Sequence, residues 1–391
     1  MAAMTKRTTY APPPLTIGDV TAPLPIIQGG MGVGISMAGL ASAVARAGGV
    51  GVIASVLIGM NEKDFHKDTR GATYRALKKQ IRLAKEAAPH GIIGVNIMVA
   101  LNDYEETARI TAKAGADLII SGAGLPLRLP GFLPEGCNTK LVPIVSSGRA
   151  AEIICRRWGL HFSRLPDAII VEGPKAGGHL GFRAKDIDSP ENYIENLTCQ
   201  VIKAVKPFEQ KEGRAIPVIA AGGIYTGEDI YKFIQMGAAG VQMGTRFVAT
   251  HECDASDKFK QAYINAKKED VTIINSPVGM PGRALRGKFI EEAKAGEKRP
   301  HRCVCKCIKT CNYPDTPYCI GMALINAQRG NIKSGFVFCG SNVWRVNKIV
   351  SVQELMDELV QDYTETAMKA AGPKLYPSSH RHPLSPHTAN P

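Results

Sequence analysis

The sequence lacks any apolar run long enough to cross a bilayer. A spanning helix needs roughly 18 or more consecutive apolar residues, and no such stretch occurs in this chain. Residues 1–14 are polar and rich in proline, without the apolar core of a secretory signal. We therefore expect a cytoplasmic protein with no membrane partner.

Aromatic residues are also scarce, at 6% of the chain, and no run of Lys and Arg interleaves with them. The net charge of +13 would suit nucleic acid, but proteins hold single strands largely through aromatic side chains that stack on the bases. The sequence thus predicts a solvated basic surface and no nucleic-acid partner. A basic rim would also suit anionic ligands, an acidic carrier protein or an electron-transfer protein.

The sequence does contain enough apolar material for a core, since 45% of its 391 residues are hydrophobic. From residue 25 onward, short apolar runs alternate with amphipathic stretches, which is typical of parallel βαβ units. Eight runs predict strands, at residues 25–28, 51–56, 92–98, 118–121, 141–145, 168–172, 217–220 and 240–243. Eight such units favour closure into an α/β fold, the (β/α)8 TIM barrel, which needs about 250 residues.

Amphipathic stretches predict the helices between these strands, at residues 37–47, 75–87, 104–114, 150–158, 191–205 and 227–236. The connection from residue 121 to 141 lacks a clear helix. Further helices are predicted at 257–266, 317–329 and 351–359. The predicted organisation is a disordered segment 1–14, a barrel 15–252, a cap with a cysteine cluster 253–340, a closing helical region 341–372 and a disordered tail 373–391.

The functional residues of such a barrel lie in the loops after the strands, and three of these loops are rich in glycine. The first strand runs into Gln-Gly-Gly-Met-Gly at residues 28–32, where a flat ligand could approach the bare backbone. The seventh runs into Ala-Gly-Gly-Ile at 221–224 and the eighth into Gln-Met-Gly-Thr-Arg-Phe at 242–247. The last two loops predict a phosphate site built from backbone N–H groups. Two ordinary turns are the alternative.

Two polar side chains stand beside these loops. Asn96 lies near the end of the third strand, and its amide can both donate and accept, as the edge of a flavin ring requires. His179 follows the sixth strand, and it alone of the nine histidines lies on a glycine-flanked loop directly beyond a strand. It could stabilise an oxygen that gains negative charge, or act as a general acid or base. A purely structural histidine is the alternative.

Six segments in chain order carry a resemblance to a known family. They are Pro-Ile-Ile-Gln-Gly-Gly-Met at 25–31, Gly-Val-Asn-Ile-Met at 94–98, Ser-Gly-Ala-Gly at 121–124, Ala-Gly-Gly-His at 176–179, Ile-Pro-Val-Ile-Ala-Ala-Gly-Gly-Ile at 216–224 and Val-Gln-Met-Gly-Thr-Arg-Phe at 241–247. Together they resemble the nitronate monooxygenase family, formerly called 2-nitropropane dioxygenases, which includes FMN-dependent enoyl-acyl-carrier-protein reductases.

The resemblance implies FMN over the barrel mouth, with His179 as the catalytic residue. The implied cofactor contacts are Gly29, Gly30, Met31, Asn96, Glu172, Gly177, Gly222, Gly223, Gln242, Gly244 and Thr245. Two features depart from the nitronate enzymes. The Gln-Gly-Gly-Met turn and the Ser-Gly-Ala-Gly loop look more like the enoyl reductases, and Lys175 stands where the family commonly has a carboxylate.

Five of the ten cysteines fall within residues 303–319, outside every barrel motif. A disulfide framework is not expected, because cytosolic thiols stay reduced. Four thiolates from one short segment fit a tetrahedral zinc ion or an iron–sulfur cluster. The most evenly spaced set is Cys303, Cys307, Cys311 and Cys319. Unligated thiols are the alternative.

The leading functional expectation is oxidation of alkyl nitronates, with His179 stabilising the anionic substrate beside the flavin. The first alternative is an FMN-dependent enoyl-thioester reductase. Its substrate would be carried on acyl carrier protein or coenzyme A, and NAD(P)H would be the electron donor. A non-flavin phosphate-binding barrel dehydrogenase and a redox sensor built on the cysteines are the others. A homodimer is also expected.

Overall fold

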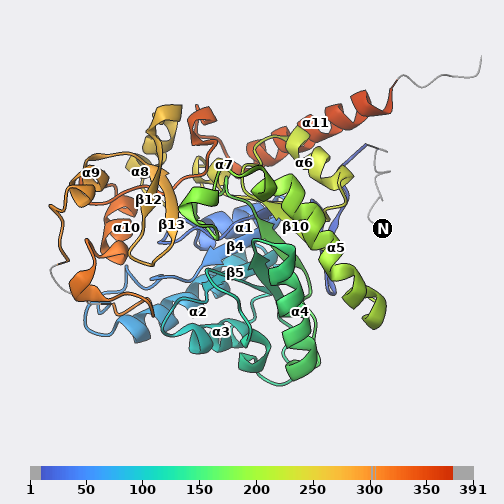
Figure 1. Ribbon diagram of the computed structural model, residues 1–391, viewed down its shortest axis with the longest axis horizontal. Helices are drawn as coiled ribbons and strands as arrows, with labels where there is room; N and C mark the ends of the chain where they lie inside the picture. The colour runs from blue at the N-terminus through green and yellow to red at the C-terminus, as the bar shows by residue number, and fades with distance from the viewer. Residues whose placement is uncertain (1–9, 301–302, 304, 373–391) are drawn as a thin grey trace, which may run out of the picture.

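Eight parallel strands close into a barrel in the computed structural model, which describes residues 10–300, 303 and 305–372 (Figure 1). In chain order they are β3 (Ile26–Gln28), β4 (Val50–Ala54), β5 (Ile92–Met98), β6 (Leu118–Gly122), β7 (Lys140–Val145), β8 (Ile169–Glu172), β10 (Val218–Ala221) and β11 (Gly240–Met243). β11 pairs with β3, which closes the sheet. The predicted TIM barrel and its eight strands are confirmed.

Helices surround this barrel as predicted. They are α1 (Ala38–Arg46), α2 (Thr69–Ala87), α3 (Tyr104–Lys113), α4 (Gly148–Phe162), α5 (Ile194–Glu212), α6 (Gly227–Gln235) and the short α7 (Thr245–Val248). The connection from β6 to β7 contains only a 3-10 turn, Leu129–Phe132. α2 begins earlier than the periodicity predicts, because the Asp68 carboxylate accepts a hydrogen bond from the Gly71 amide and caps the helix.

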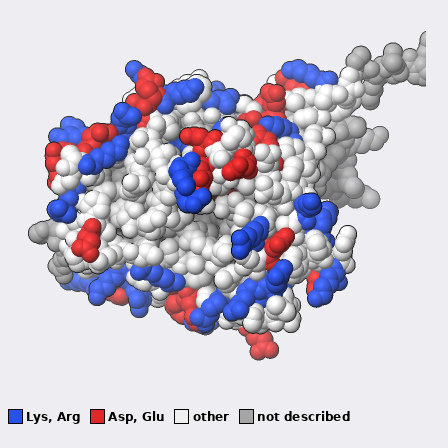
Figure 2. Space-filling view, viewed as in Figure 1, with Lys and Arg blue, Asp and Glu red and all other residues white. Residues whose placement is uncertain are grey.

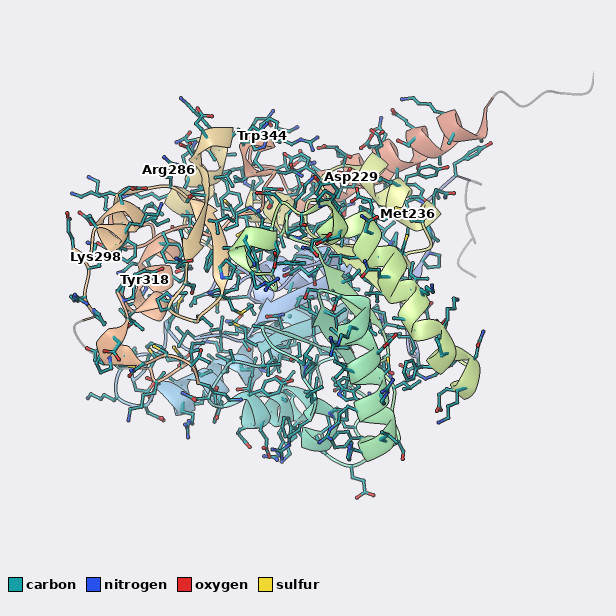
Figure 3. All side chains as sticks on the ribbon, in the orientation of Figure 1. Asp229, Met236, Arg286, Lys298, Tyr318 and Trp344 are labelled. Atoms are coloured by element: carbon teal, nitrogen blue, oxygen red, sulfur yellow. The ribbon has the colours of Figure 1, made fainter. Side chains whose placement is uncertain are left out.

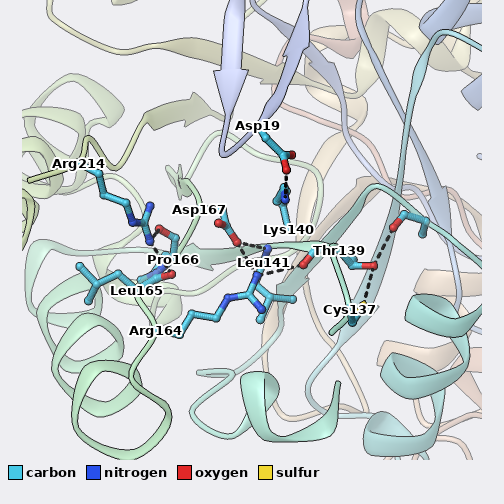
Figure 4. Close-up of polar contacts among 11 residues, drawn as sticks. Asp19, Cys137, Thr139, Lys140, Leu141, Arg164, Leu165, Pro166, Asp167 and Arg214 are labelled. Carbon is cyan, nitrogen blue, oxygen red and sulfur yellow. Dashed lines mark hydrogen bonds and ion pairs between the residues drawn. The ribbon is translucent and has the colours of Figure 1, made fainter. Parts of the chain in front are cut away.

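A hairpin that the sequence analysis missed covers the N-terminal end of the barrel. Its strands are β1 (Leu15–Ile17) and β2 (Val20–Ala22), and Leu15 packs in one buried cluster with the first residues of the barrel strands. Lys140 of β7 donates to Asp19 in the hairpin turn at 2.8 Å (Figure 4). Residues 15–22 alternate between apolar and polar around a Gly-Asp turn, so the signal was present in the sequence.

The residues after the barrel, 253–372, are called the C-terminal region here. Their elements are α8 (Asp257–Ile264), β12 (Val271–Asn275), β13 (Pro281–Leu285), α9 (Lys288–Lys294), α10 (Ile320–Gln328) and α11 (Val352–Ala371). β12 and β13 were not predicted, and β13 also pairs with β9 (Gly178–His179), a short strand beyond β8. α11 extends well past residue 359 and lies beside α6 (Figure 1).

The two terminal segments predicted to be disordered fall outside the described residues, apart from residues 10–14. The domain limits at residues 252 and 340 stay predictions. Within the described part of the chain, no helix combines the length and the apolar character needed to cross a membrane. On the face seen in Figure 2, basic and acidic side chains are interspersed, with areas free of charged residues between them.

Candidate active site

A cavity of about 280 Å³ opens where the barrel strands end, and every residue predicted to bind the cofactor or react lines it. These residues are Gly29, Gly30, Met31, Asn96, Glu172, Gly177, His179, Gly222, Gly223, Gln242, Gly244 and Thr245. Five different strand-end loops therefore contribute to one space. Their roles are not tested by this placement and stay predictions.

The turn after β3 presents backbone to the cavity without side chains. A Cβ atom at Gly30 would collide with Asn96, and one at Gly29 would lie 3.2 Å from the Gln242 side chain. The buried side chain of Gln28 links the start of this turn to β4. Its Nε2 donates to Val52 O at 3.2 Å, and its Oε1 accepts from Val52 N at 3.0 Å. The glycines are required by the close approach of neighbouring side chains.

The turns after β10 and β11 lie side by side, because these two strands are paired. Gly222 and Gly223 have φ of 97° and 88°, which side-chain-bearing residues rarely adopt. A Cβ atom at Gly222 would also lie 2.9 Å from the carbonyl oxygen of Gly173. This arrangement leaves backbone N–H groups uncovered, as an anion site requires.

His179 is held by the C-terminal region rather than by the barrel alone. On β9 it pairs with Gly282 of β13, and the buried Arg283 guanidinium donates to the carbonyl oxygens of Pro174 and Ala176 in the same loop. The imidazole packs edge to face on Phe338, with ring centroids 5.1 Å apart. These contacts fix the orientation of the ring.

Ser276, the residue that directly follows β12, contacts the imidazole. Its Oγ lies 2.7 Å from His179 Nε2 and also accepts a hydrogen bond from Val278 N at 3.3 Å. A serine hydroxyl can both donate and accept, so this contact fits either neutral tautomer of His179; when the hydroxyl donates to Nε2, the ring carries its proton on Nδ1. Sequence reasoning missed Ser276, since no barrel motif contains it.

Burial moves the proton equilibria of two groups in the cavity. It lowers the pKa of His179 to about 4, so that the ring is neutral at pH 7. It raises the pKa of Glu172, at the end of β8, to about 7. In both His179 and Glu172, burial disfavours the charged form of the side chain, as expected in a site shielded from water.

Two buried polar atoms around the cavity have no hydrogen-bond partner among the described residues: Gln242 Oε1 and Ser341 Oγ. Buried polar groups are rarely left unpaired, because each lost hydrogen bond costs about 1–3 kcal/mol. These two atoms are therefore suited to a polar ligand. Ser341 belongs to no barrel motif and was not predicted.

Aromatic side chains of the C-terminal region form a cluster behind His179. Phe338 contacts Phe336, which packs against Phe289 and Tyr318 at centroid distances of 5.9 and 5.8 Å. Tyr318 is labelled within this region in Figure 3. The cluster links the wall of the cavity to α9 and to the start of α10, so the histidine rests on a packed core.

The five clustered cysteines line a second cavity of about 650 Å³, which shares Val278, Cys307, Ile308 and Ile320 with the first. All five are free thiols, and burial raises the pKa of Cys305 and of Cys307 to about 12. No group of three or more His, Cys, Asp or Glu in the described residues is placed to hold a metal ion. The structure thus gives no support to zinc or an iron–sulfur cluster at Cys303, Cys307, Cys311 and Cys319.

The sequence profile of the family described as nitronate monooxygenase matches residues 15–362. A Mycobacterium tuberculosis relative, (3aS,4S,5R,7aS)-5-hydroxy-7a-methyl-1-oxo-octahydro-1H-indene-4-carboxyl-CoA dehydrogenase, is 30% identical over 70% of this chain and 66% of its own, so the match spans less than two thirds of that relative. A probable nitronate monooxygenase of Staphylococcus aureus (strain Newman) is 29% identical over 68% of this chain and 77% of its own.

Solved structures share the fold. FabK from Thermotoga maritima superposes with a TM-score of 0.67 at 26% identity, covering 89% of this chain and 95% of its own. Nitroalkane oxidase from Streptomyces ansochromogenes gives a TM-score of 0.69 at 21% identity, covering 90% and 98%. The fold is a closed parallel barrel whose strand ends line one cavity. The chain belongs to the nitronate monooxygenase family, which favours the flavin hypotheses over the non-flavin dehydrogenase and the redox sensor.

Proposed function

We propose that this protein is an FMN-dependent oxidoreductase that oxidises alkyl nitronates, with His179 beside the flavin. The observation that carries the proposal is the position of a partly buried imidazole in the same cavity as a bare glycine backbone on three strand-end turns. Membership in the nitronate monooxygenase family agrees with it.

The residues around the cavity fit FMN. Gly222, Gly223, Gly244 and Thr245 would hold the phosphate, and the glycine turn after β3 would lie against the flavin ring. Gln242 Oε1, which lacks a partner in the described residues, is a ready acceptor for a donor on the ligand. When bound, FMN would accept electrons from the substrate, with dioxygen as the final oxidant.

The protein supplies orientation and charge stabilisation. A neutral His179 donates one hydrogen bond to an oxygen of the anionic nitronate, while Ser276 holds the other ring nitrogen. Val278, Ile308 and Phe338 line the same cavity and exclude water, which strengthens that hydrogen bond.

A second candidate function is reduction of an enoyl thioester, with NAD(P)H as the donor. The exposed Lys175 favours it, because this side chain lies at the cavity rim with its Nζ 5.8 Å from the centre of the Tyr193 ring. A cation at the rim suits the phosphates of a coenzyme A or carrier-protein substrate. The relative from M. tuberculosis named above acts on a carboxyl-CoA.

The two functions separate in one pair of assays. Purified protein should show flavin absorbance and consume ethyl nitronate in air without a nicotinamide donor. In the absence of oxygen, NADH or NADPH with crotonyl-CoA should give no turnover. The opposite pattern would favour the reductase, and turnover of neither substrate would contradict both.

A further inference from the structure

The loop Cys339–Asn342 of the C-terminal region reaches the end of the cavity that the proposed function assigns to the phosphate. Gly340 N donates to Thr245 Oγ1 at 3.2 Å, and Asn342 Nδ2 donates to Gly223 O at 2.7 Å. Ser341 N donates to Lys175 O at 3.1 Å. The loop is thus attached to the turns after β8, β10 and β11.

Close packing leaves this loop little freedom. A Cβ atom at Gly340 would lie 2.5 Å from Thr245 Oγ1, and one at Gly177 would lie 2.6 Å from the carbonyl carbon of Cys339. The two sides of the contact therefore both depend on glycine. The position of the residue between Gly340 and Asn342 is fixed by its neighbours on either side.

That residue, Ser341, has a buried hydroxyl that lines the cavity and finds no hydrogen-bond partner among the described residues. Gly223 and Thr245, which hold its two neighbours, are residues assigned to the phosphate by the proposed function. The stem of Lys175 also lies beside this turn, since a Cβ atom at Gly223 would lie 2.9 Å from Lys175 Cβ. A hydroxyl in this position can donate its proton to an oxygen of a phosphate held by the same turns.

We infer that Ser341 is a third arm of the phosphate site, donating its hydroxyl proton to a phosphate oxygen of FMN. The inference rests on the proposed function, because it presupposes that FMN binds in this cavity. Ser341 would add a third contact to those of the barrel's two glycine turns. This contact comes from a distant segment, since Gly340 and Thr245 are 95 residues apart in the sequence.

The test compares FMN with riboflavin, which lacks the phosphate. Flavin-free protein is titrated with each ligand, and quenching of flavin fluorescence gives the dissociation constant. For Ser341→Ala we expect the constant for FMN to rise about 10- to 100-fold, the loss typical of one hydrogen bond to a charged group. The constant for riboflavin should not change.

Two further variants sharpen the measurement. Ser341→Asp places a negative charge beside the phosphate and should weaken FMN more than Ser341→Ala does, again with riboflavin unaffected. Ser334→Ala is the matched control, because this exposed serine lies in the same segment and should leave both constants unchanged.

Each outcome is decisive. If Ser341→Ala leaves FMN binding unchanged, or weakens FMN and riboflavin equally, the hydroxyl does not serve the phosphate and the inference is wrong. If the wild-type protein binds neither flavin, the proposed function itself fails, and the titration of the wild type reports this before any variant is made.

Discussion

The barrel and the C-terminal region contribute to the same cavity in different ways. The barrel supplies glycine turns whose conformation follows from local sequence, such as the positive φ of Gly222 and Gly223. The C-terminal region supplies Ser276 and Phe338, which reach His179 only through the pairing of β13 with β9. Most of the assigned cofactor contacts therefore lie in local motifs of the barrel, with Ser341 as the proposed exception, whereas the surroundings of the reacting group depend on contacts between distant segments.

The strongest test of this division is His179→Ala. We expect kcat/KM for ethyl nitronate to fall about 10²- to 10⁴-fold, because the substrate anion loses its hydrogen-bond donor. The dissociation constant for FMN should stay within about twofold of the wild type, since His179 is not among the assigned flavin contacts. A large loss of FMN from this variant would show that cofactor binding by the barrel depends on the ordered imidazole.

Removal of a side chain at the opposite end of the barrel should affect stability alone. Leu15 is 1% exposed within the hairpin that closes the barrel, and Leu15→Ala should lower the free energy of unfolding by about 2–5 kcal/mol. Urea denaturation of flavin-free protein measures this. At a temperature where the variant is folded, its affinity for FMN should be unchanged, and a weaker affinity would mean that the hairpin influences the mouth.

On the barrel side, Gly30→Ala should weaken the cofactor without removing the histidine. The added Cβ atom collides with Asn96, and such overpacking should lower the free energy of unfolding by about 1–3 kcal/mol. Because Asn96 is an assigned flavin contact, its displacement should also raise the dissociation constant for FMN, by about 2- to 10-fold if one hydrogen bond is lost. Gly159→Ala, near the C-terminal end of α4, is the control, because its Cβ atom would meet only Leu165 at 3.8 Å. The prediction is contradicted if both variants bind FMN equally well.

On the C-terminal side, Ser276→Ala should reduce kcat for the nitronate about tenfold while KM and FMN affinity stay close to wild type. The physical reason is the loss of the 2.7 Å contact that holds one ring nitrogen of His179. Ser276→Thr, which keeps a hydroxyl, should restore most of the activity. An unchanged kcat for Ser276→Ala would mean that Phe338 and the backbone alone position the ring.

The smallest expected effect is a pH dependence of stability with two opposing parts. The pKa of His179 falls on folding from 6.5 to about 4, so the unfolded chain binds more protons and stability is lost as the pH drops through this range. The pKa of Glu172 rises on folding from 4.5 to about 7, so its contribution is lost as the pH rises through that range.

Substitution separates these two parts. Denaturation of flavin-free His179→Asn at pH 5 and pH 7 should show less loss of stability on acidification than the wild type. Glu172→Gln should show less loss on alkalinisation. Identical pH profiles for all three proteins would mean that neither group is shielded from water.

The sequence predicted the barrel well because its strands are short apolar runs that alternate with amphipathic helices. Three of the strands run into glycine-rich turns, and the residues predicted there for the cofactor all line the cavity, although their roles stay predictions. It missed β12, β13, Ser276 and Ser341, because these act through pairing across the chain and leave no periodic pattern. The cysteine spacing predicted a metal centre, yet spacing alone does not direct thiols toward a common point, and no such centre occurs in the described residues.

The pairing of β9 with β13 has a consequence for protein synthesis. A nascent chain that has emerged only as far as β11 exposes every barrel strand, but β13, Ser276 and Phe338 have yet to emerge. At that stage the loop that carries His179 has no partner strand, and the imidazole lacks its contacts with Ser276 and Phe338. Competence for chemistry is therefore acquired late in translation, after the closed sheet has had time to form.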